Sequence, residues 1–149
     1  MGRLKAGPHS PSPKGRGIKP EINGVNSPLE RGARLKPGGV CKINIGLFGF
    51  GCVGKGLYDV LNHSQGLKAG ITKICVKDKT KPRTIPVENF TFTKTDVLES
   101  TEHDLIVELI DDSDTALEII TNSLLKGRDV VTAGKKVVAE NFELLYRLQ

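Results

Sequence analysis

Short apolar runs alternate with helically spaced apolar positions along residues 43–149. Near-continuous runs rich in β-branched residues fall at 43–48, 71–76, 105–110 and 129–132, and each predicts a buried strand. Apolar residues three or four apart predict helices over 52–62, from 113 or 114 to about 126, and over 141–148. Because the runs lack alternating polar residues, both sheet faces should be covered. This pattern predicts an α/β fold with a Rossmann-like, doubly wound parallel sheet.

The connections between these elements give weaker signals. Residues 77–84 read as a basic loop, while 85–103 are ambiguous, with a short strand at 91–93 and a helical turn at 96–100 as candidates. Ser113 or Asp114 is expected to cap the next helix at its start. Gly127 is expected to end that helix in a left-handed conformation.

Residues 1–40 show no apolar periodicity. They contain six of the eight prolines and eight of the seventeen glycines, a composition that buries too little surface to offset the entropy of ordering. The expected organisation is a disordered, basic extension over 1–40 followed by a Rossmann domain over 41–149. A nucleic-acid-binding arm is an alternative for the extension, and a third reading is a segment that the natural protein lacks.

The positive charge of the chain is concentrated near its beginning. Residues 1–42 carry nine Lys or Arg and two acidic residues, a net charge of +7, whereas the remainder carries −2. The basic pI therefore says little about the partners of the folded part. Aromatic residues make up 5% of the chain and tryptophan is absent, which argues against a stacking surface for nucleic acid.

The cysteines and histidines favour neither disulfides nor a metal site. Cys41, Cys52 and Cys75 form no C-x-x-C pair, and the three histidines are scattered. This usage fits a reducing compartment, so a cytoplasmic protein is expected. No apolar run approaches the ~18 residues of a membrane span, and the N-terminus lacks the apolar core of a signal peptide.

A glycine-rich loop directly follows the first predicted strand and opens the first predicted helix. It reads Gly49-Phe50-Gly51-Cys52-Val53-Gly54, a full G-x-G-x-x-G. The first glycine permits the tight turn, the second lets the backbone approach a pyrophosphate, and the third lets helix and strand pack closely. A helix N-terminus also favours phosphate through its free N–H groups and its dipole. This context predicts a site for a nicotinamide dinucleotide rather than a ligand-free glycine turn.

The end of the second predicted strand bears on the choice between NAD and NADP. An acidic residue there typically binds the ribose 2′-hydroxyl of NAD, and a basic residue suits the 2′-phosphate of NADP. The strand ends in Lys77, with further cations at Lys79, Lys81 and Arg83, which favours NADP. Asp78 follows at once and keeps NAD as an alternative.

Several segments together resemble homoserine dehydrogenases. They are residues 45–54 with the glycine loop, Lys77-Asp78 followed by Lys81-Pro82-Arg83, the strand at 104–110, the helix at 116–127, and Val130-Val131-Thr132-Ala133-Gly134-Lys135. They cover about residues 43–149 in the order and spacing of that family. The resemblance implies an oxidoreductase for the NAD(P)-dependent interconversion of L-aspartate 4-semialdehyde and L-homoserine, a step towards threonine and methionine.

The same resemblance implies roles for single residues. Phe50, Cys52 and Val53 would line the cofactor in the glycine loop. Lys77 would take the place of the family's arginine for the 2′-phosphate. Lys135 would contact the cofactor near the nicotinamide, and Ser113 would lie at the cofactor crevice. The position of Lys135 just past a parallel strand also fits the ligand edge of an open α/β sheet.

Two departures from the family concern the same crevice. Asp111-Asp112 stands where the family has a glycine pair, and carboxylates there would repel a pyrophosphate unless they point away. Gly134 stands where the family has an asparagine, which removes one polar side chain.

The family's substrate-binding and catalytic residues come from a second domain, and no counterpart of that domain is found in the 149 residues. The chain alone is therefore expected to hold no catalytic residue and to lack useful activity, because positioning the substrate supplies a large share of the rate. The partner implied is the missing catalytic domain or another chain that supplies it. A stand-alone dinucleotide-binding module and the N-terminal domain of another small-carbonyl dehydrogenase remain as alternatives.

Overall fold

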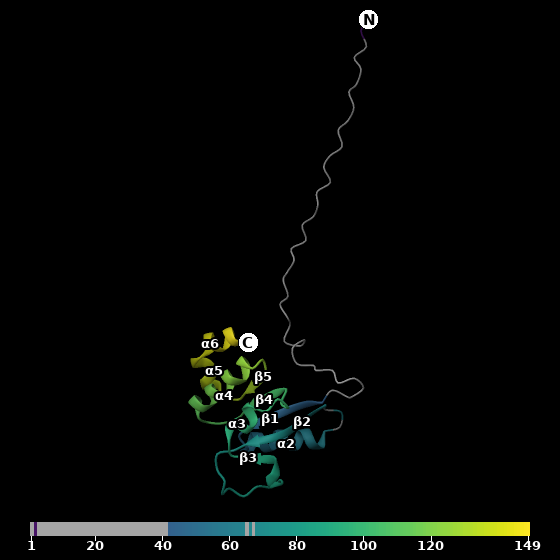
Figure 1. The fold of residues 1–149 in the computed structure, drawn as a ribbon, viewed down its shortest axis with the longest axis vertical. Coiled ribbons are helices and arrows are strands. Elements are labelled where there is room, and N and C mark those ends of the chain that lie inside the picture. Colours follow the sequence, from purple (N-terminus) through teal and green to yellow (C-terminus); the bar gives the residue numbers. More distant parts are fainter. Residues whose placement is uncertain (1, 3–41, 65, 67) are drawn as a thin grey trace.

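A computed structural model describes Gly2 and residues 42–64, 66 and 68–149 (Figure 1). The extension predicted over residues 1–40 lies outside the described residues, apart from Gly2. Five parallel strands form one sheet in the order β3-β2-β1-β4-β5. They are β1 (Ile43–Phe48), β2 (Ala69–Cys75), β3 (Phe90–Thr91), β4 (Leu105–Glu108) and β5 (Asp129–Thr132). The prediction of a Rossmann-like parallel sheet is confirmed.

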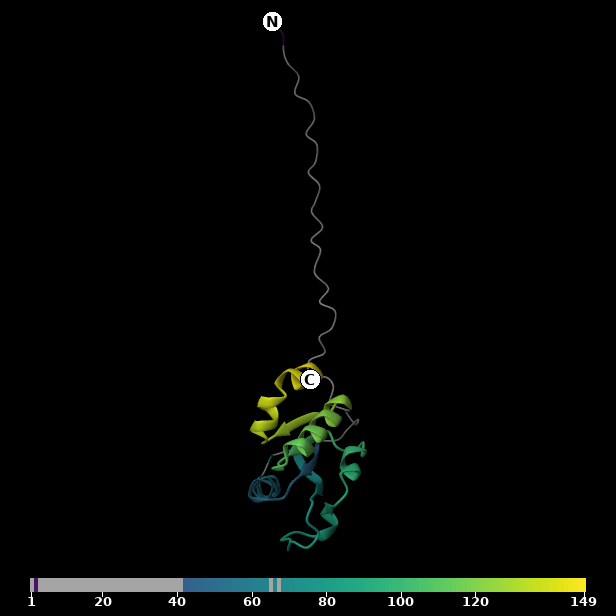
Figure 2. The ribbon, with the colours of Figure 1, turned by 90° about the vertical axis from the view of Figure 1, so that its left-hand side faces the viewer.

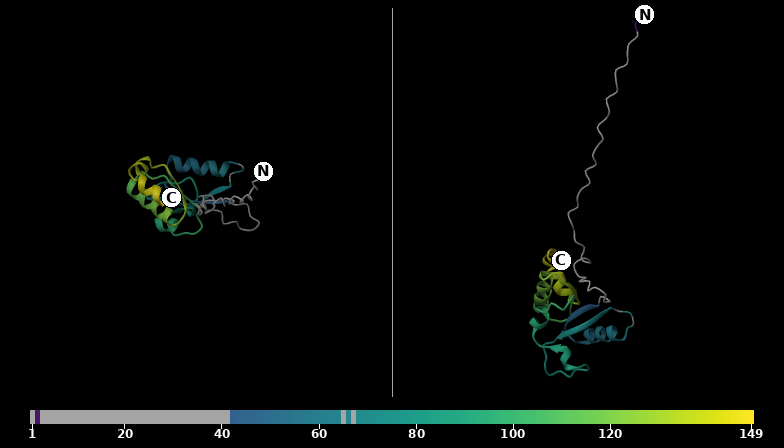
Figure 3. Two further views of the ribbon diagram at one scale, coloured as in Figure 1. Left: turned by 90° about the horizontal axis from the view of Figure 1, so that it is seen from above. Right: turned by 45° about the vertical axis from the view of Figure 1, so that its right-hand side comes forward.

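Helices cover both faces of this sheet. They are α2 (Cys52–His63), α3 (Lys94–Leu98), α4 (Ser113–Leu125), α5 (Lys135–Glu140) and α6 (Phe142–Leu148), with a short 3-10 helix at Val87–Asn89. Seen from above, α2 lies on one face, and α3 and α4 lie on the opposite face (Figure 3). The C-terminal helices gather at the β5 end of the sheet, away from the loop between β2 and β3 (Figure 2). No helix in the described part of the chain could span a membrane.

The core consists of the apolar runs seen in the sequence. Leu47 in β1, Ile74 in β2 and Ile106 in β4 are fully buried. Alternate strand residues point to opposite faces, so Leu47 packs on the α2 side, and Phe48 and Ile106 pack on the α3 and α4 side. Both faces are apolar for that reason, as expected of a parallel sheet.

The chain reverses its direction of travel across the sheet next to β1. From β1 it moves outward through β2 to β3, and it then returns to β4 on the other side of β1. The loops that leave β1 and β4 therefore diverge at the carboxyl edge. In open α/β sheets a crevice for ligands forms at this point.

Some boundaries differ from the predicted ones. The capping residue of α4 is Asp112, whose carboxylate accepts a hydrogen bond from the Thr115 N–H at 2.7 Å; the prediction of Ser113 or Asp114 was wrong by one or two residues. The short strand and helix of the ambiguous region begin one or two residues earlier than predicted, and α5 was not predicted. Gly127 has φ +69°, which confirms the predicted left-handed end of α4.

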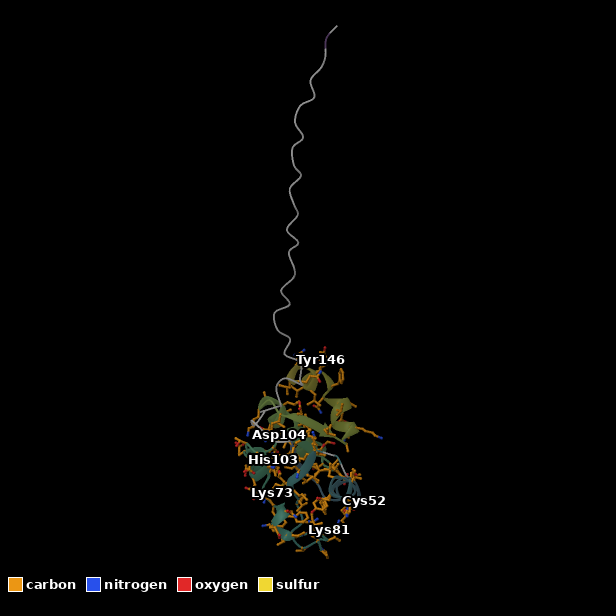
Figure 4. All side chains as sticks on the ribbon, turned by 90° about the vertical axis from the view of Figure 1, so that its right-hand side faces the viewer. Cys52, Lys73, Lys81, His103, Asp104 and Tyr146 are labelled. Carbon is orange, nitrogen blue, oxygen red and sulfur yellow. The ribbon has the colours of Figure 1, made fainter. Side chains whose placement is uncertain are left out.

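His103 is buried at the amino edge of the sheet, just before β4. It is 5% exposed, and neither ring nitrogen has a hydrogen-bond partner among the described residues. Figure 4 shows it with Asp104 on the side of the domain opposite to Cys52. Burial lowers the pKa of the His103 ring below its usual 6.5, and the nearby Arg128 lowers it further, whereas Glu102 and Asp104 act in the other direction.

Acidification is expected to destabilise the fold through His103. The folded state keeps the ring neutral while the unfolded chain takes up a proton near pH 6.5, so stability is full above that value and falls as the pH drops towards the lower folded pKa. Urea unfolding between pH 7 and 5 should show this decline, and His103→Leu should flatten it. A variant at exposed His63 controls for loss of a histidine elsewhere. An equal slope in His103→Leu and the parent chain would contradict the assignment.

Three carboxyl groups whose pKa is shifted act below this pH window. Hydrogen bonds lower the pKa of Asp78, Asp112 and Glu99 below their ordinary values of 3.8, 3.8 and 4.5. Their stabilising effects are therefore lost only at pH values below about 4.5, so they do not mask the histidine.

Candidate dinucleotide-binding site

The first glycine of the G-x-G-x-x-G loop makes the turn out of β1. Gly49 has φ +95°, a conformation that residues with a side chain rarely adopt. A Cβ there would lie 2.7 Å from the carbonyl oxygen of Leu109, and the Gly49 N–H donates to the carbonyl of Cys75 at 3.0 Å. Gly49 therefore joins the loop to the end of β2 by a hydrogen bond and packs closely against Leu109, the residue that follows β4.

The other two glycines of the motif have different surroundings. Gly54 is buried, and a Cβ on it would lie 2.5 Å from the Gly49 carbonyl oxygen, so helix and loop touch only because the side chain is missing. Gly51 is exposed, and a Cβ on it would meet nothing within 4 Å. The fold thus explains Gly49 and Gly54, whereas Gly51 leaves open space where a pyrophosphate would approach.

The start of α2 is free to receive an anion. Gly51 is its N-cap residue, no side chain caps the helix, and its first turn contains no acidic residue. The first N–H groups of the helix therefore keep their donor capacity, and the helix dipole adds a favourable field for negative charge. Together with the open space at Gly51, this arrangement fits the pyrophosphate of a dinucleotide.

The side chains between the glycines divide between surface and core. Cys52 is exposed with a free thiol, and Val53 is 63% exposed at the first turn of α2. Phe50 is 4% exposed and makes edge-on contacts with Tyr58 and Phe90, at ring-centre distances of 6.0 Å and 5.2 Å. Phe50 thus anchors the loop in the core, and its contribution to a ligand would come from its backbone.

The loop after β2 is organised around Asp78. Its Oδ1 accepts hydrogen bonds from the N–H and the hydroxyl of Thr80, both at 2.8 Å, and these bonds lower the pKa of the carboxyl. The Asp78 carbonyl accepts from the Arg83 guanidinium at 2.6 Å. The carboxylate that could bind a ribose hydroxyl is therefore partly engaged inside its own loop, whereas Lys77 is exposed at the end of β2.

The cations of this loop lie against two aromatic rings. The Lys79 ammonium lies 5.4 Å from the centre of the Phe92 ring, and the Arg83 guanidinium 5.1 Å from that of Phe90. Such cation–π contacts help hold the basic loop in one arrangement. Lys81 is exposed farther out on the loop (Figure 4).

Asp112 does not have to face a bound phosphate. Its Oδ1 accepts the Thr115 N–H. Hydrogen bonding from the side chain and the backbone of Thr115, assisted by the charges of Lys77 and Lys94, lowers the pKa of its carboxyl. The carboxylate thus caps α4 rather than standing free beside the glycine loop. Ser113, the first residue of α4, lies half-buried beside it.

Lys135 begins α5 just beyond β5. It is exposed, and no ion pair involves it within the described ranges, whereas the neighbouring Lys136 lies 3.9 Å from Glu140. Gly134 precedes it in a confined place, where a Cβ would lie 2.7 Å from Val137 and 3.3 Å from the carboxylate of Glu108. The predicted site residues thus lie on the glycine loop or just past the carboxyl ends of β2, β4 and β5.

Sequence reasoning missed one polar residue at this edge. Glu108, the last residue of β4, is fully buried. Its Oε1 accepts the Ile110 N–H at 2.6 Å, and its Oε2 accepts the Thr132 hydroxyl at 2.5 Å. The available signal was a lone acidic residue inside the apolar run 105–110, because a buried carboxylate is costly unless it is hydrogen-bonded.

Comparisons with known proteins point to one family. The model of the family described as "Homoserine dehydrogenase, NAD binding domain" matches residues 49–149. The curated homoserine dehydrogenase of Bacillus subtilis is 32% identical over 106 residues, and that of Helicobacter pylori is 31% identical over 105 residues. These matches cover 65% and 66% of this chain but 24% and 25% of the relatives, so the chain spans about a quarter of their length.

Solved structures give the same result. Homoserine dehydrogenase of S. aureus matches with a TM-score of 0.64 at 29% identity, over 72% of this chain and 29% of that one. The enzyme of Thiobacillus denitrificans matches with a TM-score of 0.66 at 28% identity, over 72% and 27%. A hyperthermophilic archaeal homoserine dehydrogenase in complex with NADPH matches at 0.59 and 24% identity, over 72% and 40%, and shares the fold.

Proposed function

We propose that this chain, which belongs to the homoserine dehydrogenase family, holds NADP(H) for the interconversion of L-aspartate 4-semialdehyde and L-homoserine. Its membership rests on the match of residues 49–149 to the NAD-binding domain of that family. The observation that carries the proposal is the combination at the end of β1. An uncapped helix N-terminus faces open space at Gly51, where the fold itself does not require a glycine. A ligand pyrophosphate accounts for both features.

NADP is proposed in preference to NAD because of the charges at the end of β2. Lys77 is exposed there, and Oδ1 of the neighbouring Asp78 already accepts two hydrogen bonds from Thr80. A cation with few competing contacts suits a 2′-phosphate, and a carboxylate already bonded within its loop is less free for a ribose hydroxyl.

Removal of Lys77 is expected to reduce the preference for the phosphorylated cofactor. The parent chain should bind NADPH more tightly than NADH, and Lys77→Ala should weaken NADPH binding about tenfold, or about 1.4 kcal/mol, with little change for NADH. Titration calorimetry with both cofactors measures the difference. Lys68→Ala removes the same charge at the opposite end of β2 and serves as the control. Equal affinities of the parent chain for NADPH and NADH would contradict the proposed preference for NADP.

The second half of the cofactor is proposed to lie over β4 and β5, next to Ser113 and Lys135. When bound, the nicotinamide supplies the hydride that is exchanged with the carbonyl carbon of the substrate. Lys135 would offer its ammonium group to negative charge there, and Ser113 would offer a hydroxyl group. The family's reaction also needs groups that hold the aldehyde against the ring. We propose that these come from outside the matched segment, and that the chain by itself binds cofactor without useful turnover.

The pathway and the place of this function are proposed from the family and from the cysteines. The reaction is a step towards threonine and methionine. Cys52 is a free thiol exposed on the cofactor loop, which suits a reducing compartment such as the cytoplasm. Cys75 is buried behind the loop, and burial, with Asp96 nearby, raises the pKa of its thiol to about 11, so it stays uncharged.

A further inference from the structure

Glu108 and Thr132 are the last paired residues of the two strands that lie beside the proposed nicotinamide site. They face each other in the final register position of β4 and β5. Paired residues of neighbouring strands project to the same face, so their side chains meet at the carboxyl edge. Both belong to the segments that carry the family resemblance, at 104–110 and 130–135.

A directed set of hydrogen bonds runs through this pair. The Gly134 N–H donates to the Thr132 hydroxyl oxygen at 2.9 Å, and the Thr132 hydroxyl donates to Glu108 Oε2 at 2.5 Å. The Ile110 N–H donates to Oε1 of the same carboxylate at 2.6 Å. The loop after β4 and the loop before α5 are therefore joined through one buried carboxylate.

The carboxylate depends on these donors. Glu108 is fully buried, and within the described residues no ion pair includes it. Removing one N–H or O–H donor from a buried carboxylate costs free energy, because the carboxylate is then left partly without hydrogen bonds away from water. The bonds therefore fix the backbone at Ile110 and at Gly134, which immediately precedes Lys135.

The positions of the loops after β4 and before α5 along the sheet indicate which half of a dinucleotide they would contact. The glycine loop follows β1, and Lys77 follows β2 on one side of it. With the pyrophosphate at α2 and the adenosine half towards β2, the nicotinamide half must extend to the other side, over β4 and β5. Glu108 and Thr132 lie at the carboxyl ends of these two strands, on that side of β1.

We propose that Glu108 and Thr132, with the N–H groups of Ile110 and Gly134, form a bracket that positions Lys135 for the nicotinamide half of the cofactor. Both are positioning residues, since they act on the cofactor through Lys135. The inference rests on the proposed function. It predicts that breaking the bracket weakens contacts to one half of the ligand and spares the other.

The test replaces the hydroxyl of Thr132 in the full chain. Thr132→Val keeps the shape and removes the hydroxyl, and Thr132→Ser restores it. We expect Thr132→Val to weaken NADPH binding about tenfold, and Thr132→Ser to stay within about twofold of the parent chain. ADP-ribose 2′-phosphate, which lacks the nicotinamide, should bind the parent chain and Thr132→Val equally. Calorimetry with both ligands gives the four affinities.

A double variant shows whether the effect passes through Lys135. If it does, Thr132→Val should change NADPH affinity little in a Lys135→Ala background, so the two effects are not additive. Unchanged NADPH affinity in Thr132→Val, or independent effects of the two changes, would overturn the bracket. Equal loss of both ligands would also overturn it, since that is the result of general damage to the fold. Failure of the parent chain to bind either ligand would instead contradict the proposed function.

Discussion

Replacing Gly54 by alanine is expected to destabilise the fold by about 3 kcal/mol, because the added methyl group has no room. Its Cβ would lie 2.5 Å from the carbonyl oxygen of Gly49, a backbone atom on a turn that is itself held by bonds to both neighbouring strands. The helix would have to move away from β1, and the contacts of Leu57 and Leu61 with the core would loosen with it. Urea unfolding followed by circular dichroism measures the change.

Gly56 provides a matched control for this substitution. It lies in the same helix, and a Cβ on it would meet nothing within 4 Å. Alanine favours a helix interior over glycine, so Gly56→Ala should raise the stability by about 0.5–1 kcal/mol. Two alanines placed two residues apart should thus act in opposite directions. A stability of Gly54→Ala equal to that of the parent chain would show that α2 and the turn are less closely packed than described.

Replacing Gly51 by alanine is expected to leave the fold intact and to weaken NADPH binding about 100-fold, or about 2.8 kcal/mol. The backbone at Gly51 has φ −85°, which alanine adopts without strain, and the space around its Cβ is open. The loss would come from the methyl group blocking the approach of the pyrophosphate to the N–H groups of α2. Calorimetric titration with NADPH, paired with unfolding curves, separates the two effects.

The same variant tests the simpler explanation of the glycine motif. If the loop were only a tight turn, Gly49 and Gly54 would be needed and Gly51 would be free to change. Gly51→Ala that binds NADPH as tightly as the parent chain would then be the expected result. The comparison therefore distinguishes a ligand-binding loop from a structural one by a single methyl group.

The main elements of the fold could be predicted because their signals are local. Four strands are apolar runs, which can be recognised without information on which strands they pair with. The glycine motif lies between a strand and a helix, in the order that its chemistry requires. Two short elements were less accessible. The two-residue β3 depends on pairing with Ile74 and Cys75 in β2, which no local pattern encodes. The helix α5 contains adjacent β-branched valines, Val137 and Val138, which have modest helix propensity.

The polar details of the site depend on which donors reach which acceptors. Asp112, Ser113 and Asp114 are all residue types that favour helix caps, and only the bond from the Thr115 N–H identifies Asp112. Glu108 in an apolar strand is visible as an anomaly, but its partners come from residues 110 and 132, which the sequence does not place beside it. The family resemblance implies that Phe50 lines the cofactor, whereas its ring lies in the core.

The edge-on contact between Phe50 and Tyr58 has a practical consequence for spectroscopy. The chain has no tryptophan and two tyrosines, so its ultraviolet emission comes from Tyr58 and Tyr146. Tyr58 touches the ring that anchors the glycine loop, whereas Tyr146 is 65% exposed on α6, stacked with Phe142. A Tyr146→Phe chain would therefore retain one emitting side chain, positioned to report on the glycine loop without an attached dye.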